Sequence, residues 1–166
     1  NGENEIVIAN RNGRAVHFIE SQVRPMGRVS TGVRGIRLDE GDDEVVGMSV
    51  INNKETETVM VVSENGYGKR SDIDSYRTTS RGVKGVKTLN ITEKTGKVVA
   101  LKTVTEQEDL MIINKSGIVI RMAVTDARVM GRATQGVRLI NLEKKNDSIA
   151  SVCTVMSSEL EATIAE

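Results

Sequence analysis

The chain is short of the residue types on which most catalytic and metal-binding sites depend. Its 166 residues include one cysteine, Cys153, one histidine, His17, one proline and no tryptophan. A disulfide within the chain is therefore excluded, and a zinc site would lack ligands. Low cysteine usage is typical of a reducing cytoplasm, which is where we expect this protein. We interpret Cys153 as a small buried hydrophobic residue and His17 as an ordinary strand residue.

Signals for membranes, secretion and catalysis are missing as well. No apolar run approaches the roughly eighteen residues of a membrane-spanning helix, so no membrane partner is expected. Residues 1–5 are polar and acidic, unlike a signal peptide, and the chain starts without methionine, so we interpret it as part of a longer protein. Residues 80–85 lack the Gly-Lys-Ser/Thr ending of a nucleotide loop. We therefore expect no catalytic residues, no cofactor and no metal ion in this chain.

What the sequence does contain is a repeat of about fifty residues. Three apolar runs are each followed by a polar turn that ends in glycine, at Gly13, Gly66 and Gly117. These glycines are 53 and 51 residues apart. Asn-Gly between two apolar segments is a strong hairpin signal, because both residues tolerate positive φ. A Gly-Val-basic segment and a closing apolar run follow each turn; we align the former at residues 32–34, 82–84 and 136–138.

Each repeat therefore offers about four short strands. They are the opening run, the strand after the turn, the Gly-Val-basic strand and the closing run. Short β-branched segments separated by glycine turns predict an all-β fold. Repetition of four-stranded units predicts a propeller-like arc of three four-stranded antiparallel blades. We place the repeats at residues 1–56, 57–107 and 108–156, followed by a tail at 157–166.

The formal net charge of zero is a cancellation between segments. The stretches from each turn glycine through the Gly-Val-basic strand hold fifteen basic and four acidic residues, a charge of +11. The other residues hold eight basic and nineteen acidic residues, a charge of −11. Because equivalent positions of a bladed fold share a face, the basic stretches predict one rim that binds a polyanion. The alternative is that these charges are solvated or paired with loop carboxylates.

The composition favours double-stranded DNA as this polyanion. Single-stranded nucleic acids bind through bases stacked on aromatic rings, and aromatic residues make up only 2% of the chain. No recognition helix is apparent. Arginine and lysine contacts to the phosphate backbone would tolerate any sequence and weaken strongly with salt.

Several motifs resemble the C-terminal domain of DNA gyrase A. They are Glu-Asn-Gly-Tyr-Gly-Lys-Arg at residues 64–70, Ser-Arg-Gly-Val-Lys-Gly-Val at 80–86, and the segments 23–28, 32–38 and 130–137. The resemblance covers about residues 5–155. It implies a β-pinwheel whose blades exchange strands and whose basic perimeter wraps duplex DNA. It also implies partners, namely the rest of gyrase A and the ATP-hydrolysing gyrase B, and a role in ATP-dependent negative supercoiling. The DNA-cleaving tyrosine belongs to the N-terminal part of gyrase A, so neither Tyr67 nor Tyr76 is given this role.

One family motif is missing from this chain. The Gln-Arg-Arg-Gly-Gly-Lys-Gly box of the family's first blade has no full copy, and its nearest echo is residues 81–85. The resemblance is therefore to the last three blades, and it does not extend to wrapping by these blades alone. Two alternatives stay open: the equivalent C-terminal domain of topoisomerase IV, and a protein-binding propeller scaffold, which would need exposed aromatic residues.

The residues expected to contact DNA are basic and fall mostly at matching positions of the repeats. Arg70 and Arg121 each lie four residues after the turn glycine, where the first repeat has His17 instead. The full set is Arg24, Arg28, Arg34, Lys69, Arg70, Arg81, Lys84, Arg121, Arg128, Arg132 and Arg138. Within this set we match Arg34, Lys84 and Arg138 across all three repeats.

Overall fold

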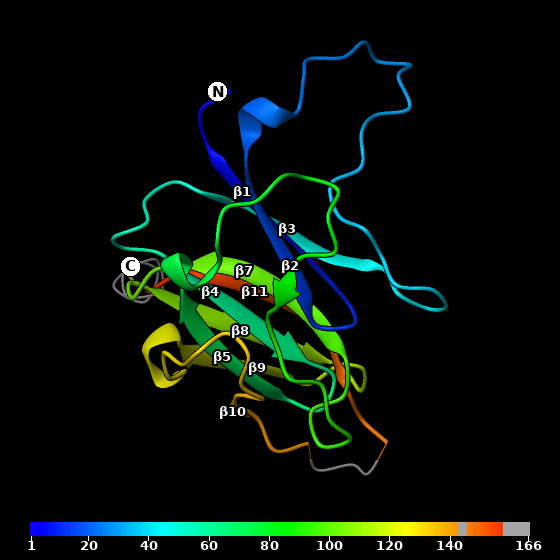
Figure 1. Ribbon diagram of the computed structural model, residues 1–166. Coiled ribbons are helices and arrows are strands. Elements are labelled where there is room, and N and C mark those ends of the chain that lie inside the picture. Colours follow the sequence, from blue (N-terminus) through cyan, green and yellow to red (C-terminus); the bar gives the residue numbers. More distant parts are fainter. Residues whose placement is uncertain (143–145, 158–166) are drawn as a thin grey trace.

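Three antiparallel β-sheets make up the computed structural model, which describes residues 1–142 and 146–157 (Figure 1). The first repeat forms β1 (Glu5–Asn10), β2 (Arg14–Ile19), the 3-10 turn η1 (Glu20–Gln22) and β3 (Val45–Ile51). The second forms β4 (Thr58–Ser63), β5 (Tyr67–Asp72), η2 (Ile73–Ser75), β6 (Val86–Lys87) and β7 (Val98–Val104). The third forms β8 (Glu108–Asn114), β9 (Val119–Ala123), η3 (Val124–Asp126), β10 (Val137–Arg138) and β11 (Ile149–Met156). The all-β, propeller-like fold expected from the sequence is confirmed.

Side-chain hydrogen bonds fix the hairpin turns. The Asn10 side-chain oxygen accepts a bond from the Arg14 backbone N–H at 2.8 Å, and its Nδ2 donates to Asp43 at 2.7 Å. Asn114 donates in the same way to Asp147 at 2.6 Å. Asparagine bonds of this kind satisfy turn backbone that no strand can reach. They also tie the first and third hairpins to the loop before the closing strand of the same repeat.

The first two sheets each borrow their outermost strand from the following repeat. Their strand orders are β3-β1-β2-β6 and β10-β5-β4-β7. β6 belongs to the second repeat but pairs with β2, Val86 lying opposite Ala15. β10 belongs to the third repeat but pairs with β5, Val137 lying opposite Gly68. The third sheet, in the order β11-β8-β9, has three strands within the described residues rather than the expected four.

The segment that follows each 3-10 turn will be called a strap, and the second and third straps carry the exchanged strands β6 and β10. The straps comprise residues 23–38, 76–91 and 127–142, each beginning directly after the 3-10 turn. The second strap runs along β2, where the Thr79 N–H donates to the His17 carbonyl at 2.8 Å. The third runs along β5, where the Met130 N–H donates to the Arg70 carbonyl at 2.8 Å. Each of these two straps therefore forms the outer edge of the preceding sheet.

The strap positions correct the alignment of the middle repeat with the other two. Gly32, Gly85 and Gly136 each lie nineteen residues after their turn glycine and adopt φ values of 85°, 79° and 78°. The middle repeat contains Gly-Val-Lys twice, and the copy that pairs with the sheet starts at Gly85, not Gly82. Lys87, rather than Lys84, is thus the counterpart of Arg34 and Arg138. The sequence alone offered both copies, and pairing to β2 selects one.

The Gly-Val-basic strand expected in the first repeat is absent. Residues 32–36 adopt no strand conformation. In the other repeats this segment pairs with the second strand of the preceding sheet, and the described residues include no sheet before the first. Strand conformation here is set by the pairing partner rather than by local preference.

The apolar core lies between neighbouring sheets and repeats with them. One cluster joins Val7 and Ala9 of the first sheet to Val61 and Leu101 of the second, with Leu89 of the strap closing it. A second cluster joins sheets two and three in the same way, with Ile140 of the strap as the counterpart of Leu89. A third, smaller cluster contains Ile8, Val16, Phe18 and Ile36 on the outer side of the first sheet. Each strap thus supplies one apolar side chain that seals a core.

The structure also bears on the predictions for Cys153 and for membrane-spanning segments. Cys153, predicted to be buried, is exposed on β11, because it lies on the side of the last sheet that no other described sheet covers. Within the described ranges no helix could cross a lipid bilayer. The expected tail, residues 157–166, falls outside the described residues except for Ser157.

Candidate nucleic-acid interface

The exposed basic residues gather on the straps. One row lies at the start of the three straps, just beyond the 3-10 turns: Arg24, Arg77 and Arg128. A second row lies beside the Gly-Val landmark of each strap: Arg34, Lys87 and Arg138. All six side chains are exposed, and none forms an ion pair with a described residue. Because the exchanged strands occupy the sheet edge opposite β3 and β7, these two rows follow one outer edge of the molecule.

A third row, Arg28, Arg81 and Arg132, includes two arginines that act as clamps. The Arg81 guanidinium donates to the carbonyls of Gln22 at 2.9 Å and Arg34 at 3.1 Å. Arg132 donates to the carbonyls of Ser75 at 2.9 Å and Lys87 at 2.8 Å. Both are half-buried, and their donors are directed at protein backbone. Arg28, in the first strap, is exposed instead.

Lys69 and Arg70 were predicted to contact DNA, but both side chains are buried in the structure. Lys69 is fully buried under the third strap, donating to the Gly131 carbonyl at 2.7 Å and the Ser71 hydroxyl at 3.2 Å. Burial, reinforced by the nearby charge of Arg132, lowers the pKa of Lys69 to about 7. The Arg70 side chain is buried and donates to the Ala127 carbonyl at 2.8 Å. Both side chains seat the strap on β5.

His17 holds the position of Arg70 in the first repeat. It is buried, and its Nδ1 lies 2.7 Å from the Tyr76 carbonyl, the counterpart of the Ala127 carbonyl. Its Nε2 faces the carboxylate of Glu5. Although burial alone would raise it, the pKa of Glu5 is lowered by hydrogen bonds from Lys54 and His17. The histidine is therefore a strap contact rather than a weakened DNA contact.

Two other predicted residues are held by carboxylates. Lys84 forms an ion pair with Asp39 at 2.6 Å, and this contact lowers the pKa of the Asp39 carboxyl. Arg121 binds Asp109 at 2.6 Å, and the pKa of Asp109 is lowered by hydrogen bonds from Ser157 and Arg121. Exposed pairs like Lys84–Asp39 are weak, so the lysine could still exchange partners. Neither belongs to the two exposed rows.

Sequence reasoning missed Arg77 and Lys87. Arg77 follows η2 after one intervening residue, as Arg24 follows η1, and Lys87 completes the second row. The constant spacing of nineteen residues between turn glycine and strap glycine would have selected Lys87. Of the predicted residues, the structure brings Arg24 and Arg128 into the first row and Arg34 and Arg138 into the second.

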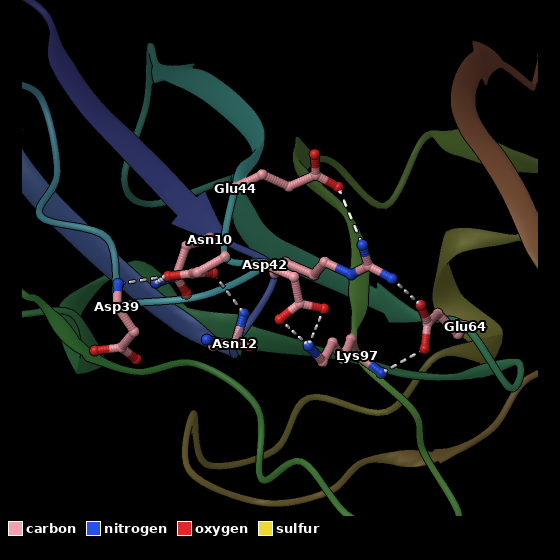
Figure 2. Close-up of polar contacts among 9 residues, drawn as sticks. Asn10, Asn12, Asp39, Asp42, Glu44, Glu64 and Lys97 are labelled. Carbon is pink, nitrogen blue, oxygen red and sulfur yellow. Dashed lines mark hydrogen bonds and ion pairs between the residues drawn. The ribbon is translucent and has the colours of Figure 1, made fainter.

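Several acidic residues lie away from the straps, where the hairpins of neighbouring sheets meet (Figure 2). Arg11 of the first repeat lies between Glu44 at 3.5 Å and Glu64 of the second repeat at 2.9 Å. Both carboxylate oxygens of Asp42 accept a bond from Lys97 at 2.7 Å. The bond from Lys97 lowers the pKa of Asp42, and the bond to Glu64 raises that of Arg11. Asp42 and Glu64 are thus engaged in joining the first two sheets.

Tyr67 orients the last member of the second row. The guanidinium carbon of Arg138 lies 5.5 Å from the centroid of the Tyr67 ring, and its Nη2 donates to the tyrosine hydroxyl at 3.1 Å. The two residues are directly opposite each other in the β5–β10 pair. A cation held over an aromatic face keeps its outward donors free. Arg138 is therefore presented to solvent in a restricted range of conformations.

Comparison with known proteins finds relatives for all three repeats. Residues 4–52, 57–105 and 108–153 match the family described as DNA gyrase C-terminal domain, beta-propeller. The chain is similar to DNA gyrase A of Staphylococcus aureus (strain MRSA252), with 50% identity over 141 residues. That match covers 85% of this chain, which spans only 16% of the length of the relative.

Two solved structures share the architecture. The DNA gyrase A C-terminal domain superposes with a TM-score of 0.84 at 28% identity, covering 93% of this chain and 51% of the other. The C-terminal domain of DNA topoisomerase IV superposes with a TM-score of 0.87, covering 99% of this chain and 51% of the other. At 24% identity, the second likeness shows the fold alone.

Proposed function

Because the chain belongs to the DNA gyrase C-terminal domain family, we propose that it is a non-catalytic module that binds duplex DNA. The contacts are made by the two exposed strap rows, Arg24, Arg77 and Arg128 together with Arg34, Lys87 and Arg138. In the whole protein this chain is part of gyrase A. There it presents a bound DNA segment to the cleaving core during ATP-dependent supercoiling with gyrase B.

One observation carries this proposal: the same two basic positions are exposed and free of ion pairs to described residues in all three repeats. Each repeat therefore offers two cations at a fixed spacing along one outer edge. A repeated cation pair matches a polyanion with a repeating charge, and duplex DNA carries one charge about every 1.7 Å of its axis. Asp42 and Glu64 are paired with Lys97 and Arg11 between the hairpins, away from these cations.

The composition of these two rows favours DNA binding that does not depend on base sequence. They consist of arginine and lysine side chains at a strap surface, with no described element that could enter a groove. Contacts of this type position the protein on phosphates and carry no sequence information. Affinity should therefore be similar for duplexes of different sequence and fall steeply with salt.

The protein-binding scaffold receives no support from the aromatic residues. Phe18 and Tyr76 are buried, and the half-buried Tyr67 is engaged with Arg138. The equivalent domain of topoisomerase IV would use the same rows, and the fold likeness does not separate the two.

Salt dependence tests the binding. If the six side chains each neutralise one phosphate, the slope of log affinity against log salt should be about −5. The double variant Lys87→Glu/Arg138→Glu should lose affinity for all sequences alike and show a shallower slope. Its matched control, Lys94→Glu/Lys115→Glu, changes the net charge equally at exposed positions outside the straps. Equal losses in the two variants would reduce the effect to net charge and refute the strap interface.

The wider role is tested in the whole enzyme. Full-length gyrase A carrying Lys87→Glu/Arg138→Glu, assembled with gyrase B and ATP, should supercoil DNA poorly while still cleaving it. Unchanged supercoiling would show that these rows do not guide the DNA segment.

A further inference from the structure

Two of the three repeats pair a basic side chain on their second strand with a carboxylate near the start of their first strand. These pairs are His17 with Glu5 in the first repeat and Arg121 with Asp109 in the third. Strand register places Arg70 and Thr58 at the matching positions of the middle repeat. Threonine thus stands where the other two repeats have a carboxylate. The middle repeat keeps the basic side chain and lacks its acidic partner.

The guanidinium of Arg70 is fixed in place although its charge is poorly matched. Its side chain is only 6% exposed, and its Nε donates to the Ala127 carbonyl at 2.8 Å. Its Nη1 lies 3.4 Å from an oxygen of Glu106, whose side chain is 72% exposed. Asp72, two residues farther along β5, forms no ion pair with it, and no residue that the structure describes accepts a bond from its Nη2. A buried cation of this kind favours an additional anionic partner.

Arg70 and Thr58 line a cavity of about 630 Å³. The linkers before β4 and after β7 and the start of the third strap form its other walls, and all of its lining residues lie within 54–129. The cavity is therefore built by the interior of the sequence and not by either end. The Thr58 hydroxyl makes only a long bond, 3.5 Å, to the Val104 carbonyl, so it is available to a ligand. A cavity of this volume lies in the range of small-molecule sites.

The charge along the cavity changes sign from its buried end to its open end. Arg70 is buried, whereas the carboxylates of Glu55, Asp72 and Glu106 belong to exposed residues. Neither Glu55 nor Asp72 forms an ion pair within the described part of the chain. Lys54, the other cation at the cavity, is neutralised by a carboxylate of the first sheet at 2.7 Å. A simple anion would be attracted at one end and repelled at the other, whereas a molecule with both charges satisfies both ends.

We propose that this cavity binds a small zwitterion of the amino-acid class, with its carboxylate on Arg70 and its ammonium group at the open end beside Glu55 and Asp72. The carboxylate takes the place that an acidic side chain has in the other two repeats, and it accepts bonds from the guanidinium and the Thr58 hydroxyl. Glu106 turns into solvent, because its contact with Arg70 is long and its side chain is exposed. The site uses neither of the two exposed basic rows and requires no DNA.

Three small molecules with the same carbon chain separate the two charges. The probes are 4-aminobutyrate, butyrate and butylamine, titrated into the nitrogen-15-labelled chain without DNA and followed through the backbone amide shifts around the cavity. We expect 4-aminobutyrate to bind with a Kd of about 1 mM, as suits so small a ligand. Butyrate and butylamine each lose one charged contact and should bind about tenfold more weakly or less. The absence of saturable shifts with 4-aminobutyrate overturns the proposal, as does equal or tighter binding of either of the other probes.

Substitutions at the two ends of the cavity locate the ligand. Thr58→Glu installs the carboxylate that the first repeat carries at this position, so the chain should fold, as the amide spectrum can verify, and binding of 4-aminobutyrate should be abolished. The matched control Thr58→Val has nearly the same shape and no charge, and should weaken binding about fivefold at most. Asp72→Asn should weaken 4-aminobutyrate but not butyrate. Unchanged binding to Thr58→Glu overturns the carboxylate site, and equal effects of Asp72→Asn on both probes overturn the placement of the ammonium group.

Discussion

Arg81 and Arg132, fifty-one residues apart in the chain, make the same two hydrogen bonds to the repeat before their own. Each guanidinium joins the last residue of the preceding 3-10 turn, Gln22 or Ser75, to the second-row residue of the preceding strap. A basic residue that recurs at a fixed repeat position is thus not necessarily a DNA contact. Recurrence at one repeat position indicates that the residue has the same role in each repeat. The hydrogen-bond partners of the side chain show what that role is.

The two backbone hydrogen bonds of Arg132 predict that Arg132→Ala destabilises the protein, whereas substitution of the nearby Arg128 does not. Arg132→Ala leaves the Ser75 and Lys87 carbonyls without their charged donor, and should lower the free energy of unfolding by about 1–3 kcal/mol. Arg128→Ala removes an exposed, unpaired side chain and should change it by less than about 0.5 kcal/mol. Urea denaturation of the two variants gives the comparison. Equal stability of both would show that the clamp contributes nothing.

A second prediction concerns the glycines that let a strap approach the sheet. Gly136 and Gly32 both have positive φ, so alanine at either position should cost about 1–2 kcal/mol in backbone strain. A Cβ at Gly136 would also lie 2.6 Å from the Gly68 carbonyl, whereas one at Gly32 meets nothing within 4 Å. Gly136→Ala should therefore be clearly less stable than Gly32→Ala in thermal unfolding. A similar loss in both would mean that the strap can shift without cost.

Lys69 predicts an unusual dependence of stability on pH. Its folded pKa of about 7 lies below the ordinary lysine value of 10.5. The unfolded chain therefore binds more protons between these values, and the contribution of Lys69 to stability rises with pH across that window. Lys69→Met should flatten this rise and stabilise the fold near pH 6, since Thr134 still donates to the Gly131 carbonyl.

The control for Lys69 is Lys87→Met, which removes an exposed lysine and should leave the pH dependence intact. Urea midpoints at pH 6 and pH 9 distinguish the variants. A wild-type protein that loses stability between those pH values, relative to Lys69→Met, would contradict the predicted sign.

The contact between Tyr67 and Arg138 predicts that DNA affinity falls more for Tyr67→Leu than for Tyr67→Phe. Tyr67→Leu removes both the ring under Arg138 and the hydroxyl that accepts its hydrogen bond. Since an exposed cation–π contact contributes about 0.5–1 kcal/mol, affinity should fall about two- to fivefold if that contact orients Arg138. Tyr67→Phe should fall less. In the Arg138→Ala background both substitutions should have no effect on binding, measured by fluorescence anisotropy at one salt concentration.

The architecture was accessible from the sequence because it repeats. Turn glycines such as Gly13 and Gly66 must adopt positive φ, and the apolar runs beside them must be buried, so both leave a local signature. The register of the middle repeat was not accessible, because Gly82 and Gly85 begin the same three-residue motif and only pairing with Ala15 distinguishes them.

The site was less predictable than the fold for a physical reason. Lys69 and Arg70 lie on a strand whose outer side is covered by a strap from about sixty residues later in the chain. No local pattern reveals that cover, and a basic residue under it has the same sequence signature as one in solvent. Cys153 was misjudged for the opposite reason, since its apolar run borders a face that no described sheet covers.

The exchange of strands between repeats makes the length of the basic edge adjustable. Each strap requires only a hairpin before it, and each hairpin requires only a strap after it. Inserting or deleting one whole repeat therefore leaves every internal sheet complete and changes the number of sheets by one. The protein can thus be lengthened one repeat at a time, and each added repeat extends the track that DNA would follow by the same two cations.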